Sequence, residues 1–289
     1  MAHQDIGLIG LGLLGAAIAE RLHHSGIQVR GWDIDSEKTA AAVRANHAHR
    51  QAPEEIAASC DRILLCLPNS AAVESVIAQL DAHLRPGTVI ADATTGSPGI
   101  VENLAARLTL RHVEYADACI GGSSEDVRQR RATVMFGGSE AAFSACLPIF
   151  DTYAQSSFHL GPAGAGTRMK LAFNLVLGLH RAVLAEGLAF ARGAGISLED
   201  ALAVLKDGAA YSRVMDTKGE KMIKRDFEPQ ARLSQHLKDV RLILEEGVSG
   251  KTTLPLSSLH ETLLSHLEAA GHGAEDNSAI FRWFDIPPG

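Results

Sequence analysis

Short apolar runs alternate with longer amphipathic stretches over the first half of the chain, with turn residues between them. An apolar run of strand length predicts a strand buried on both faces, and the stretches between the runs predict helices. This alternation predicts a doubly wound sheet with helices on both faces. The predicted strands are 6–9, 27–32, 62–67, 88–91, 112–116, 132–136 and 156–160, and the predicted helices are 13–24, 71–84, one that opens near Pro98, and 140–150.

The pattern changes after a glycine-rich segment at 161–166. From Thr167 to Gly193 the chain is apolar around nearly all sides of a helix, which requires burial on several faces. We therefore expect the long helix, and its stretch 171–179 above all, to pack against its own domain and a second subunit. No convincing strand follows, so we expect an α/β protein with a doubly wound domain at 1–162 and an all-helical domain at 163–289. The further predicted helices are 198–206, 212–224, 233–246, 256–270 and a tail that ends near Trp283.

The first predicted strand runs directly into G-L-G-L-L-G at 10–15, where the first predicted helix begins. Gly10 permits a tight turn, Gly12 leaves the backbone open to a pyrophosphate, and Gly15 lets the helix pack closely on the strand. The helix N-terminus then offers N–H groups and the positive end of a dipole to phosphate. In this context the motif predicts a Rossmann-type dinucleotide site. The predicted cofactor contacts in the turn are Gly10, Leu11, Gly12, Leu13, Leu14 and Gly15.

Asp33 follows the second predicted strand, close to the spacing of about 20 residues at which an acid binds the adenosine ribose. A carboxylate there accepts hydrogen bonds from both ribose hydroxyls of NAD and repels the additional phosphate of NADP. The sequence therefore predicts a preference for NAD. Arg30 and Lys38 lie nearby in the sequence, so NADP stays open as the alternative cofactor, and a solvated turn acid is the alternative interpretation of Asp33.

Length and composition fit a globular protein of two domains, since the chain has 289 residues, 46% hydrophobic and 21% charged. The net charge of −7 and the lack of a long basic run disfavour nucleic acid and anionic membranes as partners. The apolar segment 6–19 lacks a cationic leader, and its glycine turn explains it better than a signal peptide does. The cysteines and histidines show no ligand spacing, so we expect reduced thiols, no metal site and a cytoplasmic protein.

A dehydrogenase needs a group that accepts the hydroxyl proton and a cradle for an anionic substrate. Lys170 follows the glycine-rich segment, and Asn174 lies one turn further on the same helix face. In a closed, partly apolar cleft the charged form of a lysine is destabilised, so its pKa falls and it can exchange a proton. Asn174 would hold this lysine by a hydrogen bond. Spacing alone, however, favours a solvated lysine at the start of a helix.

The loop at 121–124, G-G-S-S, follows a predicted strand that ends near Asp117. The carboxyl ends of strands are where α/β sheets bind ligands, and successive N–H groups in such a loop can form an anion nest. An ordinary Gly/Ser turn explains the loop equally well. Lys238 and Asp239 on their own read as a surface pair in the middle of a helix.

Five segments in the same order resemble the β-hydroxyacid dehydrogenase family, the group of 3-hydroxyisobutyrate dehydrogenase and tartronate semialdehyde reductase. The first is the glycine turn, and D-A-C-I-G-G-S at 117–123 is similar to the family's D-A-P-V-S-G-G. The segment 161–174 is similar to G-x-x-G-x-G-x-x-x-K-x-x-x-N, and K-D-V at 238–240 to K-D-L. L-P-N at 67–69 is the fifth, with D-A-T-T at 92–95 resembling the D-x-S-T loop. The resemblance covers nearly the whole chain.

By this resemblance Lys170 is the catalytic acid/base and Asn174 is its partner. Thr95 would lie beside the nicotinamide, and Leu67 and Pro68 would line the adenosine side of the cofactor. The resemblance also implies a Rossmann domain followed by a helical domain, assembled as a homodimer or homotetramer.

The resemblance places the substrate carboxylate on the loop of Gly121, Gly122 and Ser123, bound through the backbone N–H groups of Gly122 and Ser123. Lys238 would reach the closed site of cofactor and substrate. The family's serine is Gly121 here and its proline is Cys119, so a hydroxyl donor to the carboxylate is missing unless Ser123 or the next serine replaces it. This departure affects the substrate more than the reaction class.

The sequence as a whole predicts an NAD(P)-dependent oxidoreductase that interconverts a small 3-hydroxy acid and its semialdehyde or keto form, with Lys170 as acid/base. One alternative is an NADPH-dependent semialdehyde or imine reductase, although imine reductases usually lack the lysine. The other is a non-catalytic dinucleotide-binding homologue, which the presence of both Lys170 and Asn174 disfavours.

Overall fold

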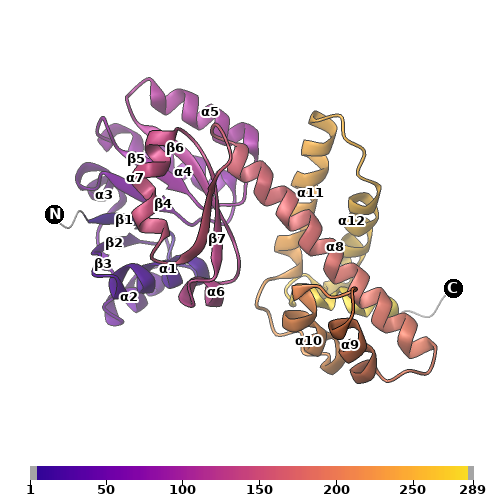
Figure 1. The fold of residues 1–289 in the computed structure, drawn as a ribbon. Helices are drawn as coiled ribbons and strands as arrows, with labels where there is room; N and C mark the ends of the chain where they lie inside the picture. Colours follow the sequence, from indigo (N-terminus) through magenta and orange to yellow (C-terminus); the bar gives the residue numbers. More distant parts are fainter. Residues whose placement is uncertain (1–4, 286–289) are drawn as a thin grey trace. The chain divides into compact units, whose positions relative to one another are not determined.

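The computed structural model describes residues 5–285, and the chain divides into two compact units, Met1–Lys170 and Leu171–Gly289. Figure 1 shows an α/β unit and a helical unit, with the long helix α8 (Ala165–Gly193) belonging partly to each. This architecture confirms the predicted fold class. The domain boundary predicted between residues 162 and 163 precedes the division and stays a prediction.

The first unit is built on one eight-stranded sheet in the order β3-β2-β1-β4-β5-β6-β7-β8 (Figure 1). The six strands from β3 to β6 are parallel, β7 is antiparallel to β6, and β8 is parallel to β7. The carboxyl ends of β1, β2, β4, β5 and β6 therefore meet at one edge of the sheet. The strands are β1 (Ile6–Ile9), β2 (Val29–Trp32), β3 (His49–Arg50), β4 (Arg62–Leu65), β5 (Val89–Asp92), β6 (Glu114–Gly121), β7 (Ala132–Gly137) and β8 (Ala154–His159).

Helices cover both faces of this sheet, because successive side chains of the buried strands point to opposite faces. On one face the strands pack with α1, α2 and α7, and on the other with α3, α4 and α5. The two apolar layers leave the strand ends as the accessible part of the sheet. The helices are α1 (Leu13–His24), α2 (Ser36–Arg44), α3 (Pro53–Ser59), α4 (Ser70–Leu80), α5 (Pro98–Thr109), α6 (Ser124–Arg128) and α7 (Glu140–Phe150).

Four elements of this unit were not predicted, namely α2, β3, α3 and α6. The three helices are short and carry many polar residues, and β3 consists of two exposed residues at the sheet edge, so none produces an apolar run. The antiparallel direction of β7 was not predicted either. A parallel strand requires a crossover of about a dozen residues or more, and the connection 122–131 is shorter, so the chain turns back.

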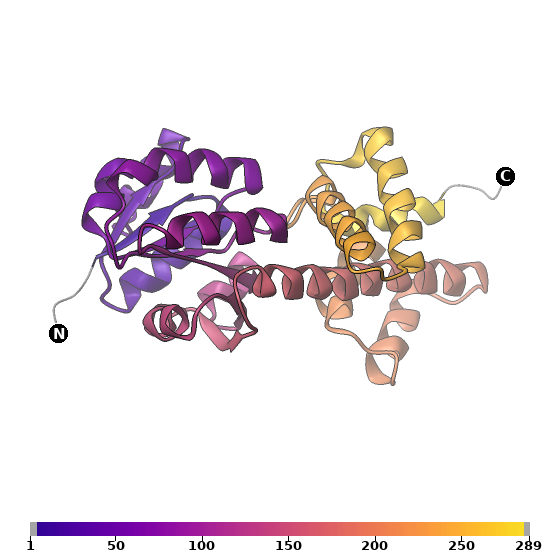
Figure 2. The same ribbon diagram turned by 90° about the horizontal axis from the view of Figure 1, so that it is seen from above.

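The helical unit packs its helices around one apolar core, and α11 and α12 lie along the same side of α8 (Figure 2). The predicted segment 212–224 contains a π-helical turn at Met215–Gly219 before α10 begins, and α12 ends before a second such turn at Glu268–His272. Among the described residues its β pairing is a single bridge between Arg232 and Asp276. The remaining helices are α9 (Leu198–Asp207), α10 (Glu220–Lys224), α11 (Leu233–Ser249), α12 (Pro255–Leu267) and a 3₁₀ segment at Asn277–Asp285.

Asp276 is the polar centre of the helical unit. Its fully buried carboxylate accepts hydrogen bonds from Lys218 Nζ at 2.9 Å, from the Gln230 N–H at 2.9 Å and from the Ser278 hydroxyl at 2.7 Å. Burial opposes ionisation of Asp276, but the bonds from Lys218 and Ser278 outweigh it and hold its pKa below the usual range. Burial also lowers the pKa of Lys218. The ion pair of Lys218 and Asp276 therefore links the segment after α12 to the segment before α10.

Between residues 5 and 285, α8 is the one helix long and apolar enough to cross a membrane by length and composition. One of its faces, with Leu184, Ala185 and Leu188, belongs to the core of the helical unit. Helices at the core of globular proteins have the same composition, so we interpret α8 as a core helix. The predicted cytoplasmic location stays a prediction.

Candidate functional site

The turn after β1 contains three glycines, and the packing of the chain requires two of them. Gly10 has a φ of +96°, and a Cβ on it would lie 2.3 Å from the Cys66 carbonyl oxygen. A Cβ on Gly15 would lie 1.9 Å from the Gly10 carbonyl oxygen, so both positions exclude a side chain by internal packing. A Cβ on Gly12 would meet nothing within 4 Å. Its glycine is therefore not required by the chain itself, which fits a position approached by an external ligand.

The N-terminus of α1 faces this open position. Gly12 is the N-cap and provides no side-chain acceptor, and the first turn of α1 contains no acidic residue. The N–H groups of the first turn and the positive end of the helix dipole thus remain for an anion. Residues 10–15 consequently fit a dinucleotide pyrophosphate, as the sequence predicts.

Asp33 lies just beyond β2 and is hydrogen-bonded to the glycine turn. Its Oδ2 accepts a hydrogen bond from the Leu11 N–H at 2.7 Å, and its Oδ1 accepts one from the Asp35 N–H at 2.9 Å. An ionised carboxylate has about four acceptor positions, so it retains capacity for ribose hydroxyls. Lys38 Nζ lies 3.8 Å from Asp33 Oδ1 and places a half-exposed cation beside the same carboxylate.

The loops after β4 and β5 are joined to each other. The Leu67 N–H donates to Thr94 Oγ1 at 3.1 Å, and the Ser97 N–H donates to Ser70 Oγ at 2.9 Å. These two bonds bracket Pro68 on one loop and Thr95 on the other. The predicted cofactor residues Leu67, Pro68 and Thr95 therefore come together at the sheet edge that also carries the glycine turn.

Asp92 supports the second of these loops from within the sheet and was not predicted as a site residue. Its Oδ1 accepts from the Thr94 N–H at 2.8 Å, and its Oδ2 accepts from the Tyr115 hydroxyl at 2.6 Å. Burial raises the pKa of Asp92 to about 6, despite these hydrogen bonds. The sequence places Asp92 in the D-x-S-T-like segment, but its burial depends on the neighbouring strand.

The loop after β6 differs from its predicted chemistry at Ser123. Gly121 ends the strand opposite Thr133, and Gly122 has a φ of +138°, which favours glycine. Ser123 is the N-cap of the short helix α6, and both its N–H and its hydroxyl donate to Asp126 Oδ2, at 2.9 and 2.7 Å. Ser123 can therefore bind a substrate only by leaving Asp126, so its hydroxyl does not replace the missing family serine in this arrangement.

Lys170 and Asn174 lie one turn apart on α8, as predicted. Lys170 is half-buried and Asn174 is buried. Asn174 Nδ2 donates to Asp239 Oδ2 at 2.9 Å, and Lys238 Nζ lies 3.0 Å from Asp239 Oδ1. Asp239 thus connects Asn174 to Lys238 within the helical unit, and the pair of residues 238 and 239 is not an ordinary surface pair.

Asn174 reaches α11 because Gly178, one turn further along α8, has no side chain. A Cβ on Gly178 would lie 2.4 Å from His236 Nε2 on α11 and 2.8 Å from His260 Cε1 on α12. Burial, with a contribution from Arg181, lowers the pKa of His260 to about 4, so this ring is neutral at physiological pH. Three helices therefore meet at one tightly packed turn next to Asn174.

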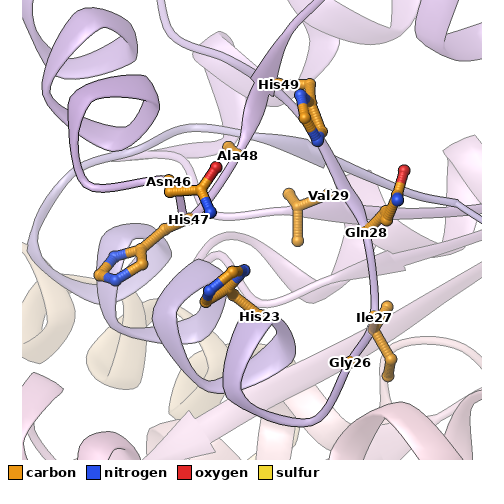
Figure 3. A pocket seen from close by; sticks show the side chains of 9 residues that line it. All are labelled: His23, Gly26, Ile27, Gln28, Val29, Asn46, His47, Ala48 and His49. Atoms are coloured by element: carbon orange, nitrogen blue, oxygen red, sulfur yellow. The ribbon is translucent and has the colours of Figure 1, made fainter.

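A cavity of about 240 Å³ lies at the C-terminal end of α1 in the first unit (Figure 3). Among its lining residues are His23 on α1, His47 before β3 and His49 within β3. The rings of His23, His24 and His47 lie within 6.0 Å of one another, centroid to centroid. In the described part of the chain, however, no group of three His, Cys, Asp or Glu side chains is arranged to hold a metal ion.

Comparison with known proteins identifies the family. Residues 5–161 match the family model described as the NAD binding domain of 6-phosphogluconate dehydrogenase. Residues 164–284 match the model described as NAD-binding of NADP-dependent 3-hydroxyisobutyrate dehydrogenase. The chain belongs to the β-hydroxyacid dehydrogenase family. This membership confirms the nicotinamide dinucleotide cofactor and the class of reaction, oxidoreduction of a small hydroxy acid.

The similarity to known β-hydroxyacid dehydrogenases extends over nearly the whole chain. The chain is 31% identical over 281 residues to 2-(hydroxymethyl)glutarate dehydrogenase of Eubacterium barkeri, covering 96% of this chain and 93% of the relative. It is 28% identical over 285 residues to L-threonate dehydrogenase of Cupriavidus necator, covering 97% and 96%. The crystal structure of 3-hydroxyisobutyrate dehydrogenase from Salmonella typhimurium matches with a TM-score of 0.88 and 27% identity, covering 96% and 99%.

Proposed function

We propose that this β-hydroxyacid dehydrogenase oxidises the hydroxyl group of a small 3-hydroxy carboxylate with NAD, and that Lys170 is the acid/base. The observation that carries the proposal is the position of Lys170 in the first unit. It stands in the second turn of α8, and the first turn of that helix is hydrogen-bonded to Asp117 on β6. The same strand continues into the loop of Gly121 and Gly122.

The bound nicotinamide supplies the hydride acceptor, and the protein supplies the proton transfer. In the oxidative direction neutral Lys170 Nζ accepts the proton of the substrate hydroxyl, and in reduction charged Lys170 returns it. Asn174 donates its amide N–H to Asp239, so its carbonyl oxygen is the atom that would accept a hydrogen bond from Lys170. Thr95, Leu67 and Pro68 would form the cofactor side of the site.

The substrate carboxylate is assigned to the loop of Gly121, Gly122 and Ser123, through the backbone N–H groups of Gly122 and of Ser123 once it leaves Asp126. Lys238 would contribute its cation. The names of the relatives, 2-(hydroxymethyl)glutarate, L-threonate and 3-hydroxyisobutyrate dehydrogenase, all describe hydroxy carboxylates. Gly121 offers no hydroxyl donor, so we expect the carboxylate to be bound through backbone N–H groups and charge.

A preference for NAD follows from Asp33, whose carboxylate retains acceptor positions for ribose hydroxyls. Lys38 beside it favours the second candidate, an NADPH-dependent semialdehyde or imine reductase, because its cation would attract the additional phosphate. Titration of the protein with NAD and NADP separates the two. Tighter binding of NADP would overturn the NAD preference and favour the second candidate.

The test of the function is turnover by wild type and Lys170→Ala with NAD and a panel of hydroxy acids that includes the three named above. Loss of a positioned proton-transfer group lowers turnover by about 10² to 10⁴. We expect a loss of this size in Lys170→Ala, with NAD binding retained because the glycine turn is unchanged. The wild-type oxidative rate should rise with pH, since Lys170 must be neutral to accept a proton. Cofactor binding without any turnover would instead indicate a non-catalytic homologue.

A further inference from the structure

Asp117 is a completely buried carboxylate on β6, and its two oxygens accept hydrogen bonds from the residue that precedes α8 and from the first turn of α8. Oδ1 accepts a hydrogen bond from the Gly164 N–H at 2.8 Å, and Oδ2 accepts one from the Thr167 N–H. A carboxylate of the sheet therefore takes the place of the side-chain cap that begins many helices. The N-terminus of the helix is attached to one strand of the sheet.

The same turn is packed so closely on the sheet that no side chain fits between them. A Cβ on Gly166 would lie 2.4 Å from the Met135 carbonyl oxygen, and a Cβ on Gly137 would lie 2.7 Å from the Gly166 nitrogen. The glycines of the segment 161–166 thus serve contact between α8 and the strands β6 and β7. The joint consists of backbone contact plus two charge-assisted hydrogen bonds.

An acidic group in this position is costly for the fold. Burial raises the pKa of Asp117, although the bonds from Gly164 and Thr167 oppose the increase. Asp92, also buried, is the Cα partner of Asp117 in the register between β5 and β6. Apolar contacts alone would hold a helix on a sheet without burying a carboxylate, so the directional hydrogen bonds of Asp117 call for a functional explanation.

We propose that Asp117 is a positioning residue that sets Lys170 relative to the substrate loop. Lys170 follows Thr167 by less than one helical turn, and Gly121 follows Asp117 on the same strand. One carboxylate therefore fixes the start of the helix that carries the proposed acid/base and the strand that carries the proposed carboxylate loop. The inference rests on the proposed function of Lys170.

The test compares Asp117→Asn with wild type in kinetics and in hydrogen exchange. The asparagine oxygen can accept one of the two N–H groups, and its amide nitrogen opposes the other. A displacement of about 1 Å in a reacting group costs on the order of 10²-fold in rate, so we expect kcat to fall by about 10- to 100-fold. The KM values for NAD and substrate should stay unchanged, and amide exchange in 161–170 should become faster.

Val134→Ala is the matched control, since it removes two buried methyl groups from β7 and leaves the Asp117 hydrogen bonds intact. It should lower the melting temperature while keeping kcat and the exchange of 161–170 at wild-type values. Thr167→Val is a milder variant in case Asp117→Asn does not fold. It removes the hydroxyl hydrogen bond to Asp117 and keeps the backbone N–H, so it should lower kcat in the same direction but less.

Three outcomes would overturn the inference, and they are distinguishable. If Lys170→Ala loses turnover while Asp117→Asn keeps wild-type kcat, Lys170 acts as proposed and Asp117 does not position it. If Lys170→Ala turns over like wild type, the proposed role of Lys170 fails and the positioning role fails with it. A fall of kcat in Val134→Ala as large as that in Asp117→Asn would also overturn it, because general destabilisation would then explain both.

Discussion

At the scale of single residues, Gly12 is the glycine of the turn that packing within the chain does not require. Gly10 and Gly15 are held by contacts within the chain, whereas nothing lies within 4 Å of a Cβ on Gly12. The backbone at Gly12 has a φ of −65°, which any residue adopts. If the pyrophosphate binds at this turn as predicted, a side chain at Gly12 would occupy its space without disturbing the protein.

We therefore predict that Gly12→Ala folds normally, since a well-tolerated surface change shifts stability by roughly 0.5 kcal/mol or less. It should bind NAD at least about tenfold more weakly, because the added methyl group would occupy the predicted pyrophosphate position. Melting curves and titration with NAD measure the two effects. Gly15→Ala is the contrasting variant, because its Cβ would collide with the Gly10 carbonyl oxygen and destabilise the unit. Unchanged NAD affinity in Gly12→Ala would place the pyrophosphate elsewhere.

Asp92 gives a second prediction for a single residue, which concerns pH. Its pKa in the folded protein is raised to about 6 from the ordinary 3.8, so folding favours the protonated form. Its contribution to stability is complete below the unfolded pKa and is lost as the pH rises through about 6. Above that pH the buried charge costs up to about 3 kcal/mol.

Asp92→Asn cannot ionise, and it can still accept from the Thr94 N–H and donate to the Tyr115 oxygen. We expect this variant to be more stable than wild type at about pH 8, and the difference to shrink towards about pH 4. Chemical denaturation at several pH values measures it. A less stable Asp92→Asn at about pH 8 would mean that the bonds to the carboxylate outweigh its burial.

At the scale of elements, helices with strong local signals were predictable, whereas contacts between neighbouring strands were not. α1 and α7 begin and end where the sequence predicts, at 13–24 and 140–150, because caps and apolar spacing mark their ends locally. The predicted 71–84 continues past Leu80 only as a 3₁₀ turn. The roles of Asp92 and Asp117 depend on the pairing of β5 with β6, which no local pattern contains.

The helical elements give a prediction at Asp276, the acceptor that joins the turn before α10 to the segment after α12. Removing one partner of a buried ion pair leaves the other charge uncompensated, which typically costs about 3 to 5 kcal/mol. Asp276→Ala would leave Lys218 buried without its carboxylate and should destabilise the helical unit by an amount of this order. Urea denaturation followed by circular dichroism measures the change.

Lys224→Ala is the control for this measurement, because its pair with Glu220 is fully exposed. It should leave the unfolding midpoint where it is in wild type. If Asp276→Ala also unfolds at the wild-type midpoint, the pair with Lys218 does not hold the helical unit together.

At the scale of the whole molecule, the order of elements and the reaction class were predictable because five motifs occur in sequence along nearly the entire chain. Which residues meet in the helical unit was not predictable. Asn174 and Asp239 are 65 positions apart, and their hydrogen bond follows from the close packing of α8 and α11 at Gly178. The sequence contained a signal for it, since Asp239 adjoins Lys238, but only the fold shows that it is buried.

The last prediction concerns assembly and rests on the face of α8 away from the helical core. Val176, Val183 and Phe190 are 51%, 67% and 79% exposed and recur every seven residues, which places them on one side of the helix. A row of large exposed apolar side chains on one helix is typical of an interaction surface. We expect a homodimer or homotetramer formed through this stripe, with a multiple of the 30.7 kDa chain mass in light scattering at micromolar concentration.

Val183→Asp places a charge in the middle of the stripe and should shift the protein towards the monomer. Leu110→Asp is the matched control, because Leu110 is 84% exposed at the end of α5 in the other unit. It should keep the wild-type mass. A monomeric wild type, or equal dissociation by both variants, would show that α8 does not form the subunit interface. Dissociation by Val183→Asp alone would instead assign the long apolar helix two roles, core of its own unit on one face and subunit contact on the other.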